Sequence, residues 1–209
     1  MSIAESPLLG PMRKSMGNFT VYSLNGMTIV RSKAFNFKDP KTEKQLIMRA
    51  RMSQLAKTYR TFSSILCLGF PENSVGKSPQ NMLVSANFST AFEMVDEKPV
   101  ISYPQLQVAK GSLPEAKVLQ AFVGVEGITL RYDADLSPND IDATDEMIAC
   151  ALLKTGELLI ARQFRGYEAI GTILLKYPAL QAENVACCYV FTRSGDGKKA
   201  SNSVFVEVK

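Results

Sequence analysis

Hydrophobic and polar residues alternate in two short runs near the start of the chain, residues 19–24 and 27–33. The pair Asn25 and Gly26 separates them, and such a pair suits a tight type I′ turn because both residues tolerate positive φ. The two runs therefore predict a β-hairpin.

A helical period follows between residues 39 and 69. Asp39 precedes Pro40, a favourable first-turn residue, and Thr42 and Gln45 have the spacing of a capping box. Six apolar side chains then recur at intervals of four and three: Met48, Met52, Leu55, Tyr59, Phe62 and Leu66. This single stripe favours burial against the second half of the chain, with a helix–helix dimer as the alternative.

The rest of the chain changes from helical to β-type patterning. Residues 80–95 indicate a shorter helix or an irregular segment, and the prolines at 99 and 104 interrupt the pattern. The candidate strands are residues 105–109, 117–123, 127–133, 146–153, 157–163, 169–175, 185–193 and 202–208. Short strands with turn residues between them and no helix predict an antiparallel β-sandwich of about seven strands.

The predicted organisation is therefore an α+β N-terminal module followed by an all-β C-terminal domain. Residues 1–100 would form the β-hairpin and long-helix module. Residues 101–209 would form an immunoglobulin/fibronectin III-like β-sandwich.

Composition narrows the possible chemistry. The 209 residues are 46% hydrophobic and include no histidine and no tryptophan. Without histidine there is no Ser-His or Cys-His nucleophile pair and no HExxH zinc site. Cys67, Cys150, Cys187 and Cys188 include no C-x-x-C pair, so we expect buried free thiols in a reducing compartment. We expect no enzymatic activity, no cofactor and no small-molecule substrate.

The chain carries no pattern typical of a signal peptide or of a membrane-spanning helix. Its first ten residues lack a basic stretch followed by an apolar one. No run approaches roughly 18 apolar residues. We therefore expect a cytoplasmic location and no membrane partner.

Charge is distributed unevenly along the sequence. Residues 11–60 hold 11 of the 24 basic side chains and two of the 20 acidic ones, a net charge of +9, whereas the remainder is −5. The alternation places Arg31 and Lys33 on one face of the second hairpin strand. With Arg49 and Arg51 of the helix they are the candidate anion contacts, and a merely solvated face is the alternative.

Two loop motifs have the composition of ligand sites. Residues 75–78 (Val-Gly-Lys-Ser) match the end of a phosphate-binding loop, but its first glycine is replaced by Pro71 and no strand precedes it. Residues 133–146 are acidic and alternate oxygen-bearing side chains, as calcium loops do. Pro138 and Thr144 stand where such a loop needs glycine and glutamate, so a solvated loop is favoured and no metal site is predicted.

A nucleic-acid site is the alternative reading of the basic segment. Phe19, Tyr22, Phe35 and Phe37 are interspersed among its charges and would serve as stacking residues. The pI of about 8.8 is modest for a dedicated binder, so structural roles for these aromatic residues are favoured.

The end of the chain resembles fibronectin type III-like domains. The segment from Gly197 is similar to their last hairpin, and Gly127 to Tyr132 lie where they carry a strand with a buried tryptophan. Tyr132 takes the place of that tryptophan. The usual corner tyrosine is absent, with Val185 close to its position.

Most of the chain also resembles an uncharacterised family of small proteins common in Bacteroidota, known only as domains of unknown function. The matching residues are Met16-Gly17-Asn18, Gly26, Val30-Arg31-Ser32-Lys33, Asp39-Pro40-Lys41-Thr42-Glu43-Lys44-Gln45, Arg49, Tyr103, Leu106, Lys110-Gly111-Ser112-Leu113, Asp145 and residues 201–203. The resemblance implies a basic hairpin and helix module followed by a β-sandwich, and no activity.

Together these patterns predict a non-enzymatic structural or assembly protein. The sandwich would make protein contacts, either with a partner or with another copy, and the basic N-terminal face would meet an anionic partner. The histidine-free composition suits a component of a mobile element or virion. The alternative is a sequence-nonspecific nucleic-acid-binding protein.

Overall fold

The computed structural model describes residues 2–3, 14–24, 26–33, 39–71, 77–133 and 142–208. The chain divides into two compact units, Met1–Thr42 and Glu43–Lys209. We describe each unit by itself.

The first unit is a small antiparallel sheet with strand order β1-β4-β3-β2. Its strands are β1 (Ser2–Ile3), β2 (Lys14–Met16), β3 (Phe19–Leu24) and β4 (Met27–Ser32). The predicted hairpin is confirmed as β3 and β4, which pair from Phe19 opposite Ser32 to Leu24 opposite Met27. Gly26 has a φ of +78°, as the turn requires, while Asn25 lies outside the described residues.

The second unit begins with the predicted long helix, α1 (Glu43–Gly69). Its start places Thr42 at the N-cap position. The stripe is buried only toward its C-terminal end. Leu55, Phe62 and Leu66 are at most 1% exposed, whereas Met48 and Met52 are nearly half exposed. The first two turns of the stripe therefore lie outside the core.

Helix α2 (Pro79–Asn87) is shorter and packs against α1. The Ser78 hydroxyl accepts a hydrogen bond from the Asn81 backbone N–H at 3.3 Å, and Pro79 occupies the first turn. Ser78 of the phosphate-loop-like motif is thus an ordinary helix N-cap. The preceding residues 72–76 lie outside the described part of the chain.

A hairpin that the sequence did not predict follows α2. It consists of β5 (Phe92–Val95) and β6 (Lys98–Ile101) and lies against α1. Its turn residues Asp96 and Glu97 both have positive φ, 48° and 61°, without any glycine. Gln54 of α1 donates a side-chain hydrogen bond to the Pro99 carbonyl, which fixes the hairpin to the helix.

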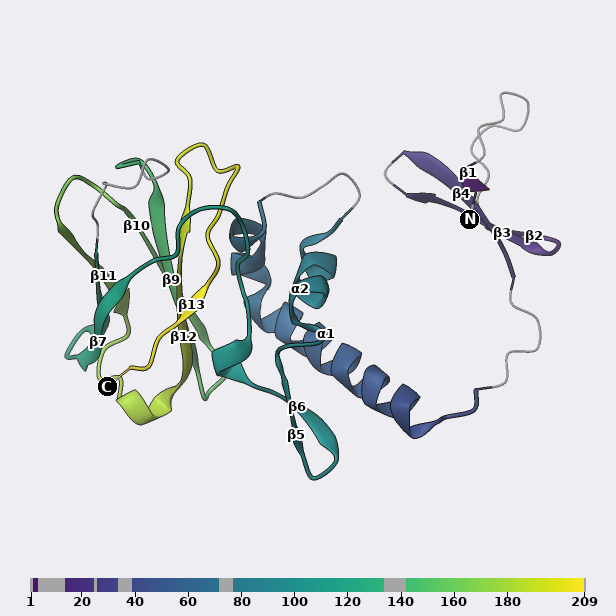
Figure 1. Ribbon diagram of the computed structural model, residues 1–209, viewed down its shortest axis with the longest axis horizontal. Coiled ribbons are helices and arrows are strands. Elements are labelled where there is room, and N and C mark those ends of the chain that lie inside the picture. Colours follow the sequence, from purple (N-terminus) through teal and green to yellow (C-terminus); the bar gives the residue numbers. More distant parts are fainter. Residues whose placement is uncertain are drawn as a thin grey trace. The chain divides into compact units, whose positions relative to one another are not determined.

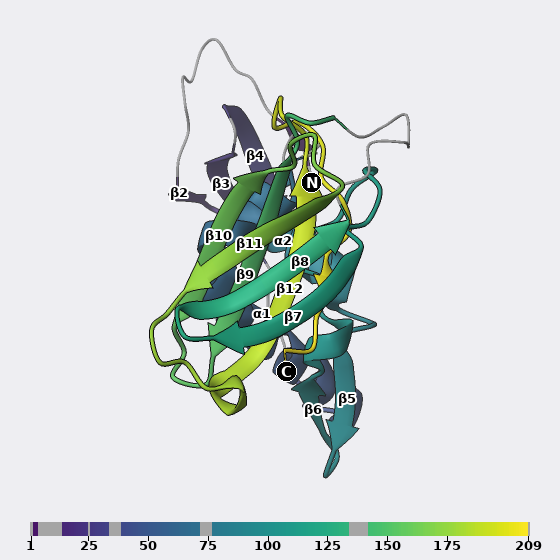
Figure 2. The ribbon, with the colours of Figure 1, turned by 90° about the vertical axis from the view of Figure 1, so that its left-hand side faces the viewer.

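Seven further strands form two antiparallel sheets. One has the order β11-β8-β7, from β7 (Val118–Gly124), β8 (Gly127–Asp133) and β11 (Ile170–Lys176). The other has the order β10-β9-β12-β13, from β9 (Glu146–Leu153), β10 (Leu158–Phe164), β12 (Val185–Arg193) and β13 (Val204–Phe205). Figure 2 shows the first sheet in front of the second. Short 3₁₀ turns lie at Tyr103–Gln105 and Ala182–Asn184.

Most predicted strands are therefore observed, and β12 matches its predicted range of 185–193. Two predictions were wrong. Residues 105–109 form no strand. The 3₁₀ turn Tyr103–Gln105 begins this segment, and its later residues hydrogen-bond to Ser203, just before β13. The last strand is only Val204–Phe205 instead of residues 202–208.

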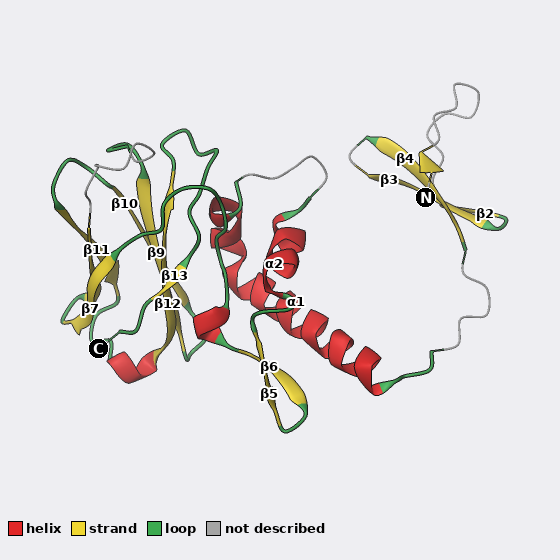
Figure 3. Ribbon diagram, in the orientation of Figure 1, coloured by secondary structure: helices red, strands yellow, loops and turns green. Residues whose placement is uncertain are grey.

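The four-stranded sheet is buried on both faces. From β9, Met147, Ala149 and Ala151 point into a cluster shared with the three-stranded sheet. The alternate residues Ile148 and Cys150 point into a second cluster, which contains Phe62, Ile65 and Leu66 of α1. In Figures 1 and 3, α1 lies against this second face, and α2 packs against α1.

The expected burial of the long helix against the second half of the chain is observed for the C-terminal part of α1. This part of the helix shares its hydrophobic cluster with the C-terminal strands, and both belong to the second compact unit. The chain is a mixed α+β protein whose C-terminal part is mostly β. Among the described residues, no helix is both long and apolar enough to cross a membrane.

Candidate functional site

Arg31 and Lys33 lie at the end of β4 in the first unit. Arg31 is exposed, and its guanidinium carbon lies 5.7 Å from the centre of the Tyr22 ring. Tyr22 pairs with Ile29, which is only 6% exposed. Ile29 lies two residues before Arg31 and so on the same face of β4. The face that carries Arg31 is therefore partly apolar. Lys33 follows the strand, and its backbone N–H donates to the Asn18 carbonyl at 2.8 Å.

Arg49 and Arg51 lie on α1 in the second unit and face different ways. Arg49 is exposed. Arg51 is half-buried, with its guanidinium 5.4 Å from the centre of the Phe92 ring and donating to the Phe88 carbonyl at 3.4 Å. Arg51 therefore joins α1 to the end of α2 and to β5. The four predicted anion contacts belong to two different compact units.

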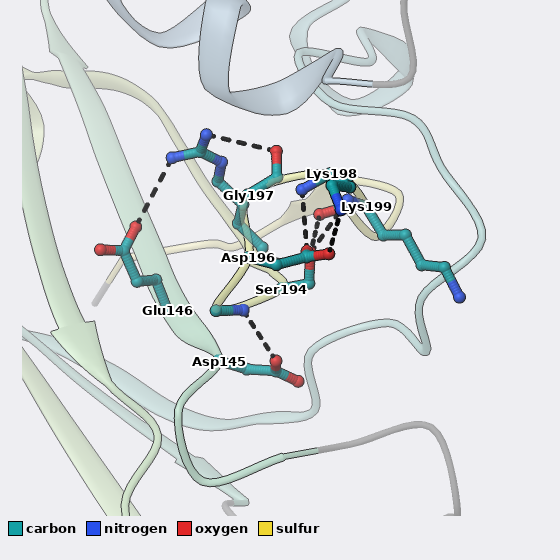
Figure 4. A network of polar contacts seen from close by, with 9 residues as sticks. Asp145, Glu146, Ser194, Asp196, Gly197, Lys198 and Lys199 are labelled. Carbon is teal, nitrogen blue, oxygen red and sulfur yellow. Dashed lines mark hydrogen bonds and ion pairs between the residues drawn. The ribbon is translucent and has the colours of Figure 1, made fainter.

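Polar side chains converge where the start of β9 meets the turn after β12 (Figure 4). Asp145 is 4% exposed, and its carboxylate accepts backbone hydrogen bonds from Asp142 at 3.1 Å and Gly195 at 3.2 Å. Arg165 is 6% exposed and donates through Nη2 to the Asp133 carbonyl at 3.2 Å, while its backbone N–H donates to the Asp145 carbonyl. These bonds join the ends of β8, β9, β10 and β12.

The turn after β12 is held by its own polar groups. The Ser194 hydroxyl donates to the Asp196 carboxylate at 2.6 Å, and the Lys198 backbone N–H donates to it at 3.0 Å. These two hydrogen bonds, the first being the larger effect, lower the pKa of Asp196. At the base of the turn, Arg193 lies 3.9 Å from Glu146 and donates to the Gly197 carbonyl at 3.3 Å (Figure 4). These contacts are intramolecular and stabilise the loop.

The acidic segment considered for calcium is only partly described. Of its alternating oxygen-bearing side chains, Asp135, Ser137 and Asn139 fall within residues 134–141, which lie outside the described part of the chain. The described carboxylates Asp142 and Asp145 bind backbone N–H groups. The described residues contain no group of three or more side chains suited to hold a metal ion.

Three of the four thiols are buried. Cys187 and Cys188 point to opposite faces of β12, into the second and the first cluster respectively. Burial raises the pKa of Cys187 to about 11, that of Cys188 to about 12, and that of Cys150 well above its usual value. A thiol that stays protonated is a poor nucleophile. Cys67 is exposed.

A groove of about 580 Å³ lies beside β7. It is lined on one side by residues 118–122 of β7 and on the other by residues 204–207. Leu119 and Phe122 are 53% and 42% exposed there. A β-bulge between Val118 and Gln120 turns Leu119 out of the regular pairing with β8.

The chain was compared with known protein families, curated proteins and solved structures. DUF6266, a family of unknown function, matches residues 11–207. The chain belongs to that family. The expected membership in an uncharacterised family is thereby confirmed. The DUF6266 match includes the four candidate anion contacts, the loop network around Asp145 and the β7 groove. No curated protein and no solved structure matched the chain.

Sequence analysis did not predict two features of this DUF6266 chain, the burial of Arg165 and the open edge of β7. A buried Arg165 carries no sequence signal, because arginine is ordinarily exposed. The edge strand β7 did carry a sequence signal. Val118–Gly124 (VLQAFVG) is mostly apolar, rich in strand-forming residues and free of charge and proline.

Proposed function

We propose that the protein is a non-enzymatic structural or assembly protein whose β-rich second unit makes protein contacts. The observation that carries this proposal is the groove beside β7, where exposed Leu119 and Phe122 lie along a strand that pairs on one edge only. Open strand edges bind extended chains through main-chain hydrogen bonds, and the side chains supply specificity.

We also propose that the seven C-terminal strands form an immunoglobulin/fibronectin III-like sandwich. Numbered from β7, the first, second and fifth strands share one sheet, and the third, fourth, sixth and seventh share the other. An immunoglobulin constant domain differs only in its fourth strand, which joins the sheet of the first. The shared cluster between the two sheets supports this assignment.

The absence of catalysis is part of the same proposal. The buried thiols have raised pKa values, and the described polar clusters hydrogen-bond within the chain. Histidine is absent from the sequence. Each of these facts supports a binding role over a reaction.

The basic N-terminal segment is proposed to meet an anionic partner. Arg31 is exposed at the end of β4, and the acidic surface of a protein is the favoured partner. Nucleic acid is the second candidate, supported by Phe19, which is 53% exposed on the same hairpin and available for stacking.

Peptide selection on the immobilised full-length chain tests the protein-contact role. We expect extended, uncharged peptides rich in β-branched and aromatic residues to be enriched, and Phe122→Lys to abolish the enrichment. The matched control is Ile160→Lys on the edge strand β10, since Ile160 is 38% exposed and Phe122 is 42% exposed. No enrichment, or the same enrichment on both variants, would contradict the proposal.

Fluorescence anisotropy distinguishes the two anionic partners. We expect a labelled poly-glutamate peptide to bind in a salt-sensitive way, and Arg31→Glu with Lys33→Glu to remove that binding. A labelled single-stranded oligonucleotide should not bind at micromolar protein in low salt. Salt-sensitive oligonucleotide binding that the same two reversals remove would replace this assignment with the nucleic-acid one.

A further inference from the structure

The turn after β12 contains the single Asp-Gly pair of the sequence, Asp196-Gly197. Aspartate followed by glycine is the aspartyl peptide unit most prone to isomerise. Glycine has no side chain to hinder attack by its own backbone nitrogen, and its backbone adopts many conformations. The Asp196 side chain is 56% exposed, so water reaches it. The pair therefore has the composition and the exposure of a modification site.

This rearrangement needs no cofactor and no oxidant. The backbone nitrogen of Gly197 attacks the side-chain carbonyl carbon, Cγ, of Asp196 in its protonated form. The N–Cγ bond forms, the bond from Cγ to the hydroxyl breaks, and the amide proton leaves with that hydroxyl as water. Addition of one water to the succinimide ring at its main-chain carbonyl then gives isoaspartate. The composition of the chain is unchanged at the end.

The folded turn holds the attacking nitrogen. The Gly197 N–H donates to the Ser194 carbonyl at 2.8 Å. Gly197 has a φ of +71°, and its own carbonyl accepts a hydrogen bond from Arg193 at 3.3 Å. The nitrogen must give up its proton to attack Cγ, so its hydrogen bond to Ser194 has to break before the ring can close. An opening of the turn must therefore precede the reaction.

The carboxylate of Asp196 is held as well (Figure 4). The Ser194 hydroxyl donates to its Oδ1 at 2.6 Å, and the Lys198 backbone N–H donates to the same oxygen at 3.0 Å. The Lys198 ammonium lies 3.6 Å from the other carboxylate oxygen. Donors of this kind favour the ionised carboxylate over the carboxylic acid, and they lower the pKa of Asp196, with the Ser194 hydroxyl as the largest cause. Only the acid form has a hydroxyl that can leave.

We infer that Asp196-Gly197 is a latent isomerisation site, which the folded turn protects and which reacts when the turn opens. The inference is independent of the proposed binding functions. Isoaspartate lengthens the main chain by one carbon atom. The lengthened segment lies within a turn whose base is the antiparallel bridge between Arg193 and Ala200, so isomerisation alters the connection between β12 and β13.

Ageing of the full-length chain at neutral pH, followed by cleavage after lysine and peptide mapping, tests the inference. The cleavage releases the peptide Tyr177–Lys198, in which isoaspartate changes the retention time but not the mass. This peptide excludes Asn25-Gly26, whose deamidation also yields isoaspartate. We expect the folded chain to isomerise about tenfold or more slowly than a synthetic peptide of the same residues, which lacks the folded turn.

Variants of Ser194 test the contribution of its hydroxyl. Ser194→Ala keeps the carbonyl that binds Gly197 but loses the hydrogen bonds of the hydroxyl to Asp196 and from Lys199. The folded variant should isomerise about twofold to tenfold faster than the wild-type chain, the effect of losing such hydrogen bonds. Ser194→Thr is the matched control, because it keeps a hydroxyl, and it should react at the wild-type rate. Circular dichroism of each variant reports whether the fold is retained.

Three results would overturn the inference: a folded chain that reacts as fast as the peptide, a Ser194→Ala variant that reacts no faster than the wild type, or a Ser194→Thr variant that reacts as fast as Ser194→Ala. A Ser194→Ala variant slower than the wild type would show that the hydroxyl assists ring closure instead of opposing it. If Ser194→Ala fails to fold, the comparison of the wild-type chain with the peptide decides.

Discussion

The ring of Tyr132 lies directly across the backbone of Gly171. The two residues are opposite each other in the pairing of β8 with β11, and a Cβ at residue 171 would overlap the aromatic ring. Tyr132 is 1% exposed and lies in the cluster between the two sheets. The bare glycine backbone thus makes room for the largest aromatic side chain of that cluster.

Gly171→Ala should destabilise the second unit by about 1–3 kcal/mol, the usual cost of overpacking a core. Gly124→Ala is the matched strand control, because a Cβ there would meet only the Gly127 carbonyl at 3.7 Å and the Thr129 hydroxyl at 4.0 Å. Urea unfolding of both variants measures the difference. Equal midpoints would mean that the Tyr132 ring moves aside at no cost.

The two buried tyrosines should respond differently to loss of the hydroxyl. Burial raises the pKa of both, but the Tyr132 hydroxyl has no hydrogen-bond partner among the described residues, whereas Tyr189 donates to the Tyr103 carbonyl at 2.7 Å. Tyr132→Phe should therefore be neutral or stabilising, and Tyr189→Phe should cost about 0.5–1.5 kcal/mol. The reverse order in denaturant titrations would contradict these assigned partners.

The period-2 runs predicted the hairpin of β3 and β4 and most of the C-terminal strands, because side-chain alternation is a local property. The β5–β6 hairpin was missed because Asp96 and Glu97 form its turn without glycine, and Pro99 lies within a strand. The run from Met147 to Leu153 is apolar throughout, and this continuous pattern indicates burial on both faces. The helical stripe was expected to pack against the second half of the chain, but this run was not identified as the strand that it covers.

Side-chain convergence was the least predictable part of the candidate sites. Arg51 stacks on Phe92, which lies far along the sequence, so periodicity on α1 indicated an exposed cation where the structure has a half-buried link. Likewise Asp145 and Gly195 meet only because β9 and β12 are neighbours. Contacts of this kind depend on sheet order, and local patterns do not encode it.

The two halves of the apolar stripe of α1 should contribute unequally to the stability of the fold. Phe62 packs edge-on against Tyr189 with ring centres 6.0 Å apart, and Phe62→Ala should cost about 3–5 kcal/mol. Met52 is 47% exposed, so Met52→Ala should cost less than about 1 kcal/mol. Thermal unfolding of both variants checks this. A loss below about 1 kcal/mol for Phe62→Ala would contradict its place in the core.

Only one of the four thiols should react in the folded protein. The raised pKa values of Cys187, Cys188 and Cys150 keep these groups protonated as well as buried, whereas Cys67 is exposed. At about pH 8, a chromogenic disulfide reagent should therefore release one equivalent from the native chain and four from the chain in denaturant. Cys67→Ser should abolish the native reaction.

The raised pKa of Cys187 also predicts how the stability of the fold changes at alkaline pH. Between pH 9.0 and about 11, Cys187 ionises in the unfolded chain but remains protonated in the folded one. The unfolded chain then binds fewer protons, so the free energy of unfolding falls as the pH rises through this window. Cys187→Ala should flatten the fall, measured by urea unfolding at several pH values, whereas Cys67→Ala should not. Equal slopes in the two variants, or fast native reaction of more than one thiol, would show that the buried cysteines are accessible to solvent.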